Sequence, residues 1–441
     1  MLKLVKLQLI RKTIRAPNAQ IAQAISNYYC TDGTHVQPPV LSNQKVKQLR
    51  DKMMELMGIS RGYQPLSFNQ NRNHLLQYLP SSQNELPTRC MQDSFDDALI
   101  PLSTDYDLQD KYVTYLGYIR LGRVMEDMDF FAVWCAMKHL KNPKQPVDQP
   151  TPYVIVTVLV DEVQFTQIIP KPNKDIRISG KVTWAGSTSM EVTVWLEQDI
   201  EGTWQRITCA VFVMVARNST NTGPAFVNKL IPNGEREIAT YKGAEARALR
   251  RKTEKIGNLI NKQPTPDEQT LIHDLFIRTV DLTDPLLGRR KLPEGCIWVE
   301  DTTMVTNIFS HPEDRNFHNK IFGGFLMRQA LELGWLTAYQ HSKHRPALRY
   351  INDISFKQPV NVGSLLRLTG QVVYTEQHFL QIVVNCEVLD HMSGKTTTTN
   401  SFHYTFEANN IVNSVVPHSY HEAMMYIDGR RHFTHAIQST K

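Results

Sequence analysis

The sequence predicts an α+β protein of two similar halves, each a curved antiparallel sheet wrapped round one central helix. Segments 105–217 and 296–408 each hold one long apolar helix candidate followed by a run of strand-like stretches. In these stretches β-branched and aromatic residues alternate with polar ones, and turn residues separate them. A single helix with four or five antiparallel strands packs as a layer on one face of its sheet. That arrangement is the hotdog fold, here in tandem.

The two segments also share a register. Phe165 and Phe356 occupy matching places, offset by 191 (356 − 165), and Gly180 and Gly370 are offset by 190 (370 − 180). A period this long far exceeds one supersecondary unit, so it indicates duplication of a whole domain and not a solenoid repeat.

Both helix candidates are apolar almost all round, which predicts that each is largely buried. Small residues stand at corresponding places, Ala132 and Ala136 in the first helix and Gly334 and Ala338 in the second, and they let a helix lie close to a sheet. The first half is expected to contain a helix at 120–140 and strands at 153–165, 175–186, 189–199 and 207–217. The second is expected to contain a helix at 323–341 and strands at 349–360, 364–376, 379–390 and 396–408.

Outside the two halves, residues 43–59 have the pattern of an amphipathic helix, and the segment between the halves is dense in charge and helix formers. We expect the run Arg247, Arg250, Arg251 and Lys252 to form a solvated face of that helical linker. The predicted organisation is a transit peptide at 1–30, a lead-in at 31–94, the N-terminal domain at 95–225, the linker at 226–290 and the C-terminal domain at 291–441.

The N-terminus carries basic residues at positions 3, 6, 11, 12 and 15, with no acid before Asp32. Basic and apolar residues alternate without an uninterrupted apolar stretch, which is typical of a mitochondrial transit peptide and predicts a matrix protein. The net charge of +6 is too mild to indicate a nucleic-acid partner. No apolar run in the sequence reaches the length of a membrane span, so no integral membrane segment is expected.

A glycine pair, Gly323 and Gly324, precedes the second apolar helix. The first N–H groups of a helix have no intrahelical partner, and the helix dipole adds partial positive charge there. Without side chains, these residues let a ligand atom approach the backbone, which suits stabilisation of an oxyanion. A tight turn into the helix is the alternative interpretation.

Other motifs are missing from the sequence. There is no G-x-S-x-G elbow, and the SGKT at 393–396 lacks the upstream glycine of a phosphate-binding loop. No His or Cys spacing indicates a metal, because His341 and His344 lack a third clustered ligand.

The segment HPEDRNFHNKIFGGFLM at 311–327 resembles the signature of hotdog acyl-coenzyme A thioesterases. With RLGRVMEDMDFFAVWCAMKH at 120–139 and YIDGRRHF at 426–433, it resembles the mitochondrial double-hotdog family of the thioesterase 9 type. The resemblance implies hydrolysis of acyl-coenzyme A to a free carboxylic (fatty) acid and coenzyme A. It implies no cofactor, since coenzyme A is part of the substrate, and a homo-oligomer assembled as a trimer of double hotdogs.

In similar enzymes the N–H of the first glycine holds the thioester carbonyl, which here implies Gly323. An Asn seven residues earlier positions water or substrate, implying Asn316, and a carboxylate about two turns into the helix acts as base or nucleophile. This helix has Leu331 at that place. Glu332 is one residue on, rotated by about 100° round the helix.

Alignment of the two helices with Met125 against Met327 places Asp129 at the carboxylate position. In the first half Leu121-Gly122 replaces the glycine pair and Thr114 replaces the Asn, so the halves are complementary. The hypothesis is a composite site of Asp129, Asn316 and Gly323, with Asn319, Phe322 and Gly324 contacting substrate. The pseudo-symmetric second site, Thr114 with Glu332, is expected to be degenerate.

Alternatives remain open. Asp129 could instead be a structural acid paired with Arg120 or Arg123. A hotdog enoyl-coenzyme A hydratase would need an Asp/His pair that the sequence does not show. A non-catalytic hotdog that binds acyl-coenzyme A is disfavoured by the intact Asn and glycine pair.

Overall fold

The computed structural model describes residues 44–58, 72–161, 163–254, 263–281, 289–314, 320–352, 354–356, 358–390 and 393–439. The predicted transit peptide at 1–30 lies outside these residues. Within them, no helix combines the length and the apolar character that crossing a bilayer requires.

The N-terminal half is a sheet curved round one buried helix, as the sequence predicts. Of the helix residues, nearly all from Val124 to Met137 are buried. The elements of this half are β1 (Asp96–Ile100), α5 (Leu121–His139), β2 (Tyr153–Val160), β3 (Val163–Phe165), β4 (Ile176–Ala185), β5 (Ser189–Ile200) and β6 (Thr203–Asn218).

The C-terminal half repeats this order. Its elements are β8 (Met304–Phe309), α8 (Gly323–Ser342), β9 (Ala347–Ile351), β10 (Ile354–Ser355), β11 (Leu365–Glu376), β12 (Phe379–Leu389) and β13 (Thr396–Glu407). The helices and main strands expected from the sequence are confirmed in both halves. The edge strands β1 and β8 were not predicted.

The remaining elements surround these two units. Helix α2 (Val46–Leu56) confirms the predicted amphipathic helix and buries Val46, Leu49 and Met53. The others are η2 (Asn73–Tyr78), η3 (Gln83–Glu85), α3 (Met91–Ser94), α4 (Tyr106–Tyr112), α6 (Gly234–Glu254), α7 (Pro266–Thr279), β7 (Cys296–Trp298), η4 (Glu300–Thr302), η5 (Pro312–Asp314), β14 (Ser414–Val416) and α9 (Tyr420–Ser439).

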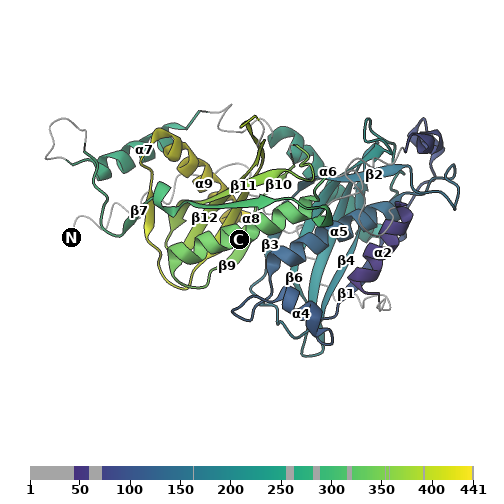
Figure 1. Cartoon of the computed structure of the whole chain (residues 1–441), viewed down its shortest axis with the longest axis horizontal. Coiled ribbons are helices and arrows are strands. Elements are labelled where there is room, and N and C mark those ends of the chain that lie inside the picture. Colours follow the sequence, from purple (N-terminus) through teal and green to yellow (C-terminus); the bar gives the residue numbers. More distant parts are fainter. Residues whose placement is uncertain are drawn as a thin grey trace.

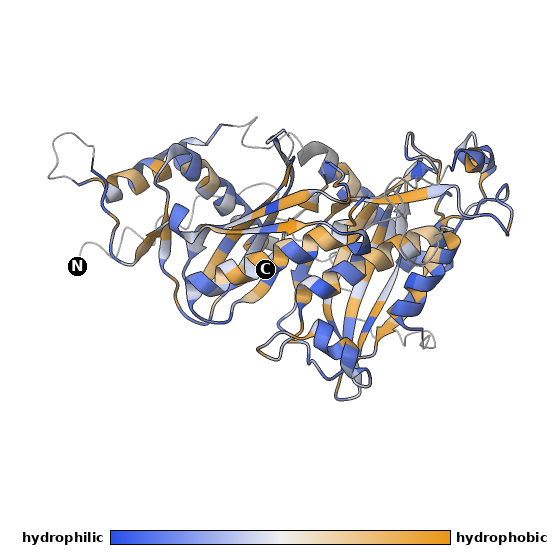
Figure 2. Cartoon of the chain, in the orientation of Figure 1, coloured by the Kyte–Doolittle hydropathy of each residue, from blue (hydrophilic) through white to orange (hydrophobic). Residues whose placement is uncertain are grey.

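The two sheets join into one. Among the described residues, twelve strands form a continuous sheet in which β3 of the first half pairs with β9 of the second, as can be followed in Figure 1. The seam has local two-fold symmetry, because Val163 pairs with Ile351 while Val160 pairs with Ile354 on β10. The central helices α5 and α8 lie together, and Figure 2 shows apolar residues along both of them.

The duplication is visible in the irregularities of the strands. A β-bulge interrupts the β4–β5 ladder between Val182 and Trp184, and another interrupts β11–β12 between Val372 and Tyr374. The offset between the bulges (372 − 182) equals the offset between Gly180 and Gly370 (370 − 180). Bulges are placed features of a sheet and not random defects. Their coincidence confirms the predicted register.

The contacts between helix and sheet confirm the alignment of the two helices. A Cβ on Gly180 would lie 3.3 Å from Sγ of Cys135, and one on Gly370 would lie 2.7 Å from Oγ1 of Thr337. The offset between these helix residues (337 − 135) equals the offset between Met125 and Met327 (327 − 125). Both glycines let the central helix approach its sheet.

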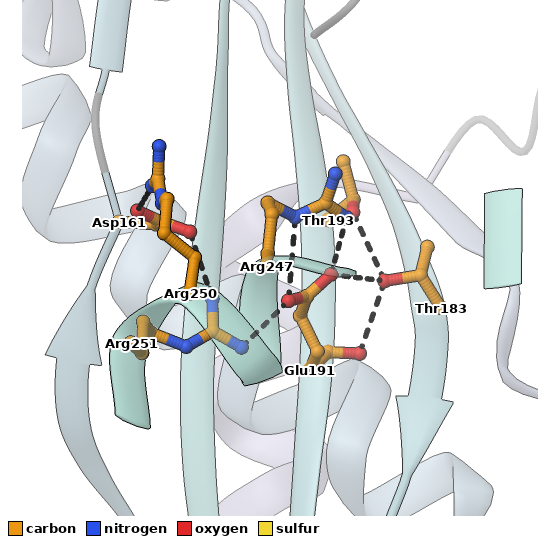
Figure 3. Close-up of polar contacts among 7 residues, drawn as sticks. All are labelled: Asp161, Thr183, Glu191, Thr193, Arg247, Arg250 and Arg251. Carbon is orange, nitrogen blue, oxygen red and sulfur yellow. Dashed lines mark hydrogen bonds and ion pairs between the residues drawn. The ribbon is translucent and has the colours of Figure 1, made fainter. Parts of the chain in front are cut away.

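The prediction of a solvated arginine face on the linker was wrong. Arg250 and Arg251 on α6 contact Asp161 at 3.0 and 2.8 Å, and Arg251 also contacts Glu191 at 3.0 Å (Figure 3). Arg247 forms an ion pair with Glu191 as well. Both carboxylates are fully buried, so α6 covers a charged spot on the outer face of the N-terminal sheet and the arginines neutralise it.

The C-terminal half has neutral counterparts at these positions. Asn352 stands where Asp161 does, since their backbone N–H groups bond to the carbonyl oxygens of His403 and Val211 respectively. Gln381 occupies the place of Glu191, because the two residues have the same offset (381 − 191) as the β-bulges after Val182 and Val372 (372 − 182). It is fully buried and accepts a hydrogen bond from Thr405. The two halves thus share a polar position on the outer face, but only the first is charged.

Candidate active site

Asp129 is a carboxylate held between the two halves. It lies on α5 with 2% of its surface exposed. Its Oδ2 accepts a hydrogen bond of 2.8 Å from the backbone N–H of Gly324, in the first turn of α8. Its Oδ1 accepts one of 2.7 Å from the hydroxyl of Thr157 on β2. The acid of one half therefore meets the helix N-terminus of the other.

Small residues at the crossing of α5 and α8 make this contact possible. A Cβ on Gly324 would lie 3.1 Å from Cα of Glu126, and one on Gly122 would lie 3.1 Å from the carbonyl oxygen of Arg328. The two contacts are pseudo-symmetric, because the offset between the glycines (324 − 122) equals the offset between their neighbours (328 − 126). The helices can approach this closely only where side chains are absent.

The environment of Asp129 tunes its acidity. Burial raises the pKa of the carboxyl to about 6, while the hydrogen bonds from Thr157 and Gly324 oppose the rise. The negative charge of Glu126 adds to the increase in this pKa and the charge of Arg50 counters it. A carboxylate with a pKa near the operating pH is suited to act as a general base.

The arginines that could have paired with Asp129 have other partners. Arg120 contacts Glu332 at 2.6 Å, and Arg123 contacts Glu126 at 3.0 Å. Asp129 bonds only to a hydroxyl and a backbone amide within the described residues. The structural ion pair is therefore not formed.

The start of α8 lies next to this acid. The N-cap residue Phe322 supplies no side-chain acceptor, and no described residue accepts a hydrogen bond from the N–H of Gly323. Gly323 and Phe322 are half-buried, and the ring of Phe356 covers the Cα of Gly323 closely enough that a Cβ would lie 2.9 Å from its Cζ. Asn316 and Asn319 lie outside the described residues.

Comparisons with known proteins show which family the chain belongs to. No protein-family model matches it. It is 41% identical over 391 residues to acyl-coenzyme A thioesterase 9, mitochondrial, of Mus musculus, covering 88% of each chain. The Homo sapiens protein of the same name is 38% identical over 389 residues, again with 88% of each chain covered. The chain belongs to the acyl-coenzyme A thioesterase family. Acyl-coenzyme A thioesterase 2, chloroplastic, of Humulus lupulus is 32% identical over 337 residues, covering 74% of each chain.

The pseudo-symmetric position in this thioesterase family member lacks the acid. Leu331 takes the place of Asp129, and Leu348 takes the place of the Thr157 hydroxyl, at the offset of the Phe165 and Phe356 pair (348 − 157). Both leucines line a cavity of about 380 Å³, together with Thr114, Gly122, Glu332 and Trp335. Glu332 faces this cavity as the partner of Arg120. This cavity thus lies at the position that the internal repeat relates to the candidate site, but it has leucines in place of Asp129 and Thr157.

Thr157 is the site residue that the sequence analysis missed. It is a single hydroxyl in the otherwise apolar strand core VIVTVLV, and it is 9% exposed. A buried hydroxyl in such a run requires a hydrogen-bond partner. That requirement was the available signal, although it does not say which residue the partner is.

Proposed function

We propose that this chain hydrolyses acyl-coenzyme A thioesters to a free carboxylic (fatty) acid and coenzyme A, at one composite site between its halves. The observation that carries the proposal is the hydrogen bond from Gly324 on α8 to Asp129 on α5. It sets a carboxylate of raised pKa at the start of α8, beside the N–H of Gly323, and acyl transfer to water needs such a base next to a backbone donor.

In the proposed reaction the N–H of Gly323 donates to the thioester carbonyl oxygen. Asp129 removes a proton from water as the water oxygen attacks the carbonyl carbon. The tetrahedral intermediate collapses, the C–S bond breaks, and the coenzyme A thiolate takes the proton from the Asp129 carboxyl. An oxyanion donor of this kind stabilises the transition state by about 2.7–4 kcal/mol.

Asp129 could also attack the carbonyl carbon itself and form a mixed anhydride that water then hydrolyses. Single-turnover hydrolysis in ¹⁸O water separates the two routes. Label in the Asp129 carboxylate shows an anhydride that water attacked at the Asp129 carbonyl carbon, because the general-base route puts label only into the released acid.

Further residues have proposed supporting roles. Thr157 positions Asp129 through its hydroxyl. Asn316 positions the water or the thioester, by analogy with the family signature, and Phe322 and Asn319 contact substrate.

The decisive experiment measures release of free thiol from acyl-coenzyme A substrates of increasing chain length. Asp129→Asn is expected to lower kcat by about 10²–10⁴-fold, the usual contribution of a general base. Glu332→Gln, the same carboxylate-to-amide change one residue beyond Leu331 in the second cavity, is expected to retain near-normal activity. A folded Asp129→Asn protein with wild-type turnover would overturn the assignment, and Asn316→Ala tests the Asn in the same assay.

An enoyl-coenzyme A hydratase is a weaker candidate, because both hydrogen-bond partners of Asp129 among the described residues lack an imidazole. Loss of enoyl absorbance without release of thiol would favour it. Tight binding of acyl-coenzyme A without any turnover would favour a non-catalytic role.

The second cavity, with Thr114 and Glu332, is proposed to be catalytically silent because Leu331 cannot accept a proton. We also propose the domain limits given above, a cleaved segment at 1–30, residence in the mitochondrial matrix, and assembly as a trimer of double hotdogs. The relatives' names support the mitochondrial part of this proposal. Sequencing of the mature N-terminus and light scattering of the purified protein test the cleavage and the trimer.

A further inference from the structure

A cluster of two imidazoles and a carboxylate lies outside the proposed active site. His403 is on β13, and Asp428 and His432 are four residues apart on α9. Oδ2 of Asp428 lies 3.8 Å from Nε2 of His403 and 3.6 Å from Nε2 of His432. The three ligand atoms all lie within 4.8 Å of one another.

The cluster sits between the sheet and the helix that covers its outer face. The next residue, Tyr404, faces α8, since a Cβ on Gly334 would lie 2.9 Å from its ring. Successive side chains of a strand point to opposite faces, so His403 points away from α8 and toward α9. The cluster is thus on the opposite face of the sheet from the central helices.

The distances suit a shared cation better than direct hydrogen bonds. Contacts of 3.6 and 3.8 Å are too long for hydrogen bonds between nitrogen and oxygen. Zinc bonds of about 2.0–2.1 Å in tetrahedral geometry place neighbouring ligand atoms about 3.4 Å apart. Because the His403 and His432 rings are stacked, placing all three atoms round one ion requires rotation of the imidazoles as well as small shifts.

The two imidazoles of the cluster are half-buried and pack against each other. The side chain of His403 is 12% exposed, and its Nδ1 is buried with no hydrogen-bond partner among the described residues. The rings of His403 and His432 are stacked, with their centroids 3.9 Å apart.

We propose that His403, Asp428 and His432 bind one divalent transition-metal ion of the zinc type. Two imidazoles and a carboxylate are a common ligand set for zinc. The side chain of Asp428 is 38% exposed, which leaves a route for the ion and a position for a water ligand. The ion ties α9 to the outer face of the C-terminal sheet and takes no part in the hydrolysis at Asp129.

Spacing in the sequence does not reveal this site. Asp428 and His432 have the i, i+4 spacing of two ligands on one helix face, but the third ligand, His403, precedes them on a separate strand. By contrast, His341 and His344 are hydrogen-bonded to Asn413 and Asn410, and neither joins the cluster.

The test uses the full chain purified without a histidine tag, stripped with chelator and then dialysed against Zn²⁺ or Co²⁺. We expect elemental analysis to find one tightly bound ion per chain. Bound Co²⁺ should also give a visible absorption band, which indicates that protein ligands hold the ion in a defined geometry. Zn²⁺ should raise the melting temperature by a few degrees. Asp428→Asn and His432→Gln should each weaken binding at least about 10-fold and abolish the thermal shift, since loss of even an outer-shell partner of a metal typically costs about 10–100-fold in affinity.

His421→Gln is the matched control, because His421 is an exposed histidine on the same helix. It should bind the ion and show the shift as the wild type does. Circular dichroism of the metal-free variants shows whether they fold. The proposal is overturned if folded Asp428→Asn binds Zn²⁺ with unchanged stoichiometry and affinity, or if the wild type binds no ion at micromolar Zn²⁺. Thiol release by the metal-free protein is scored separately, so failure here leaves the hydrolase proposal untouched.

Discussion

The backbone N–H of Gly324 donates a 2.8 Å hydrogen bond to Oδ2 of Asp129, which lies 195 residues earlier in the chain. One half of a duplicated protein thus contributes the helix terminus and the other contributes the acid. The position pseudo-symmetric to this contact pairs Gly122 with Leu331, which can accept no hydrogen bond. Duplication of one domain accounts for the matching positions of the two contacts.

The rate should depend on the ionisation of Asp129. Because burial raises the pKa of this carboxyl to about 6, kcat/KM should rise with pH through about 6 and level off above it, where the base is ionised. Thr157→Val removes a hydrogen bond that lowers this pKa, so the rising limb should move to higher pH.

Full pH profiles of thiol release measure this shift. Thr208→Val is the control, because Thr208 is a buried strand threonine that bonds to the carbonyl oxygen of Gln164. Its profile should match the wild type. If the rise of kcat/KM with pH occurs at the same pH in Thr157→Val as in the wild type, a group other than Asp129 determines the pH dependence.

A methyl group on either crossing glycine should have the same steric effect but different functional effects. Gly324→Ala puts a Cβ 3.1 Å from Oδ2 of Asp129, and Gly122→Ala puts one 3.1 Å from the backbone oxygen of Arg328. Overpacking of this kind costs about 1–3 kcal/mol of the free energy of unfolding in each case. Only Gly324→Ala displaces the acid, and its kcat should fall by about 10²-fold.

Denaturant unfolding and single-turnover hydrolysis, run on both variants, separate the two effects. Equal losses of kcat in Gly122→Ala and Gly324→Ala would place the active site symmetrically and contradict the composite arrangement.

Alanine at Gly323 should interfere through an aromatic neighbour. The new Cβ would lie 2.9 Å from Cζ of Phe356, so the ring or the helix start must move and the N–H donor is misplaced. We expect kcat to fall with little change in stability, since the ring is half-buried. Phe356→Leu added to Gly323→Ala makes room and should recover part of the lost turnover. No recovery in the double variant would mean that the methyl group itself blocks the thioester.

The buried ion pairs of the linker should support the N-terminal half. Glu191→Gln makes the first half resemble the second, where Gln381 stands, but it leaves Arg247 with an uncharged partner in a buried place. Breaking a buried pair costs about 3–5 kcal/mol of the free energy of unfolding. Glu235→Gln is the control, because Glu235 is exposed on α6, the helix that carries Arg247. It should change the free energy of unfolding by less than about 0.5 kcal/mol. Denaturant unfolding measures the free energy of unfolding of both variants. Equal losses in the two would show that the buried ion pairs do not stabilise the protein.

Periodicity and the internal repeat predict the central helices, the main strands and the helix alignment, because these features repeat locally along the chain. The alignment singled out Asp129, which the structure places against Gly324. The hydroxyl of Thr157 could not be assigned, since strand pairing and curvature decide what it faces. The burial of Arg247, Arg250 and Arg251 was missed for a similar reason. Charge on a helix predicts solvent contact unless the sheet beneath it carries buried acids, and spacing along the chain does not show that Asp161 and Glu191 lie beneath α6.

The seam between β3 and β9 has a consequence for biosynthesis. Val163 in the first half is paired only once Ile351, far along in the second half, has been made. As the first half leaves the ribosome, β3 is therefore an open edge of a largely formed sheet, and such edges recruit other strands. We expect holding chaperones to shield this edge during translation, and chains truncated before β9 to aggregate.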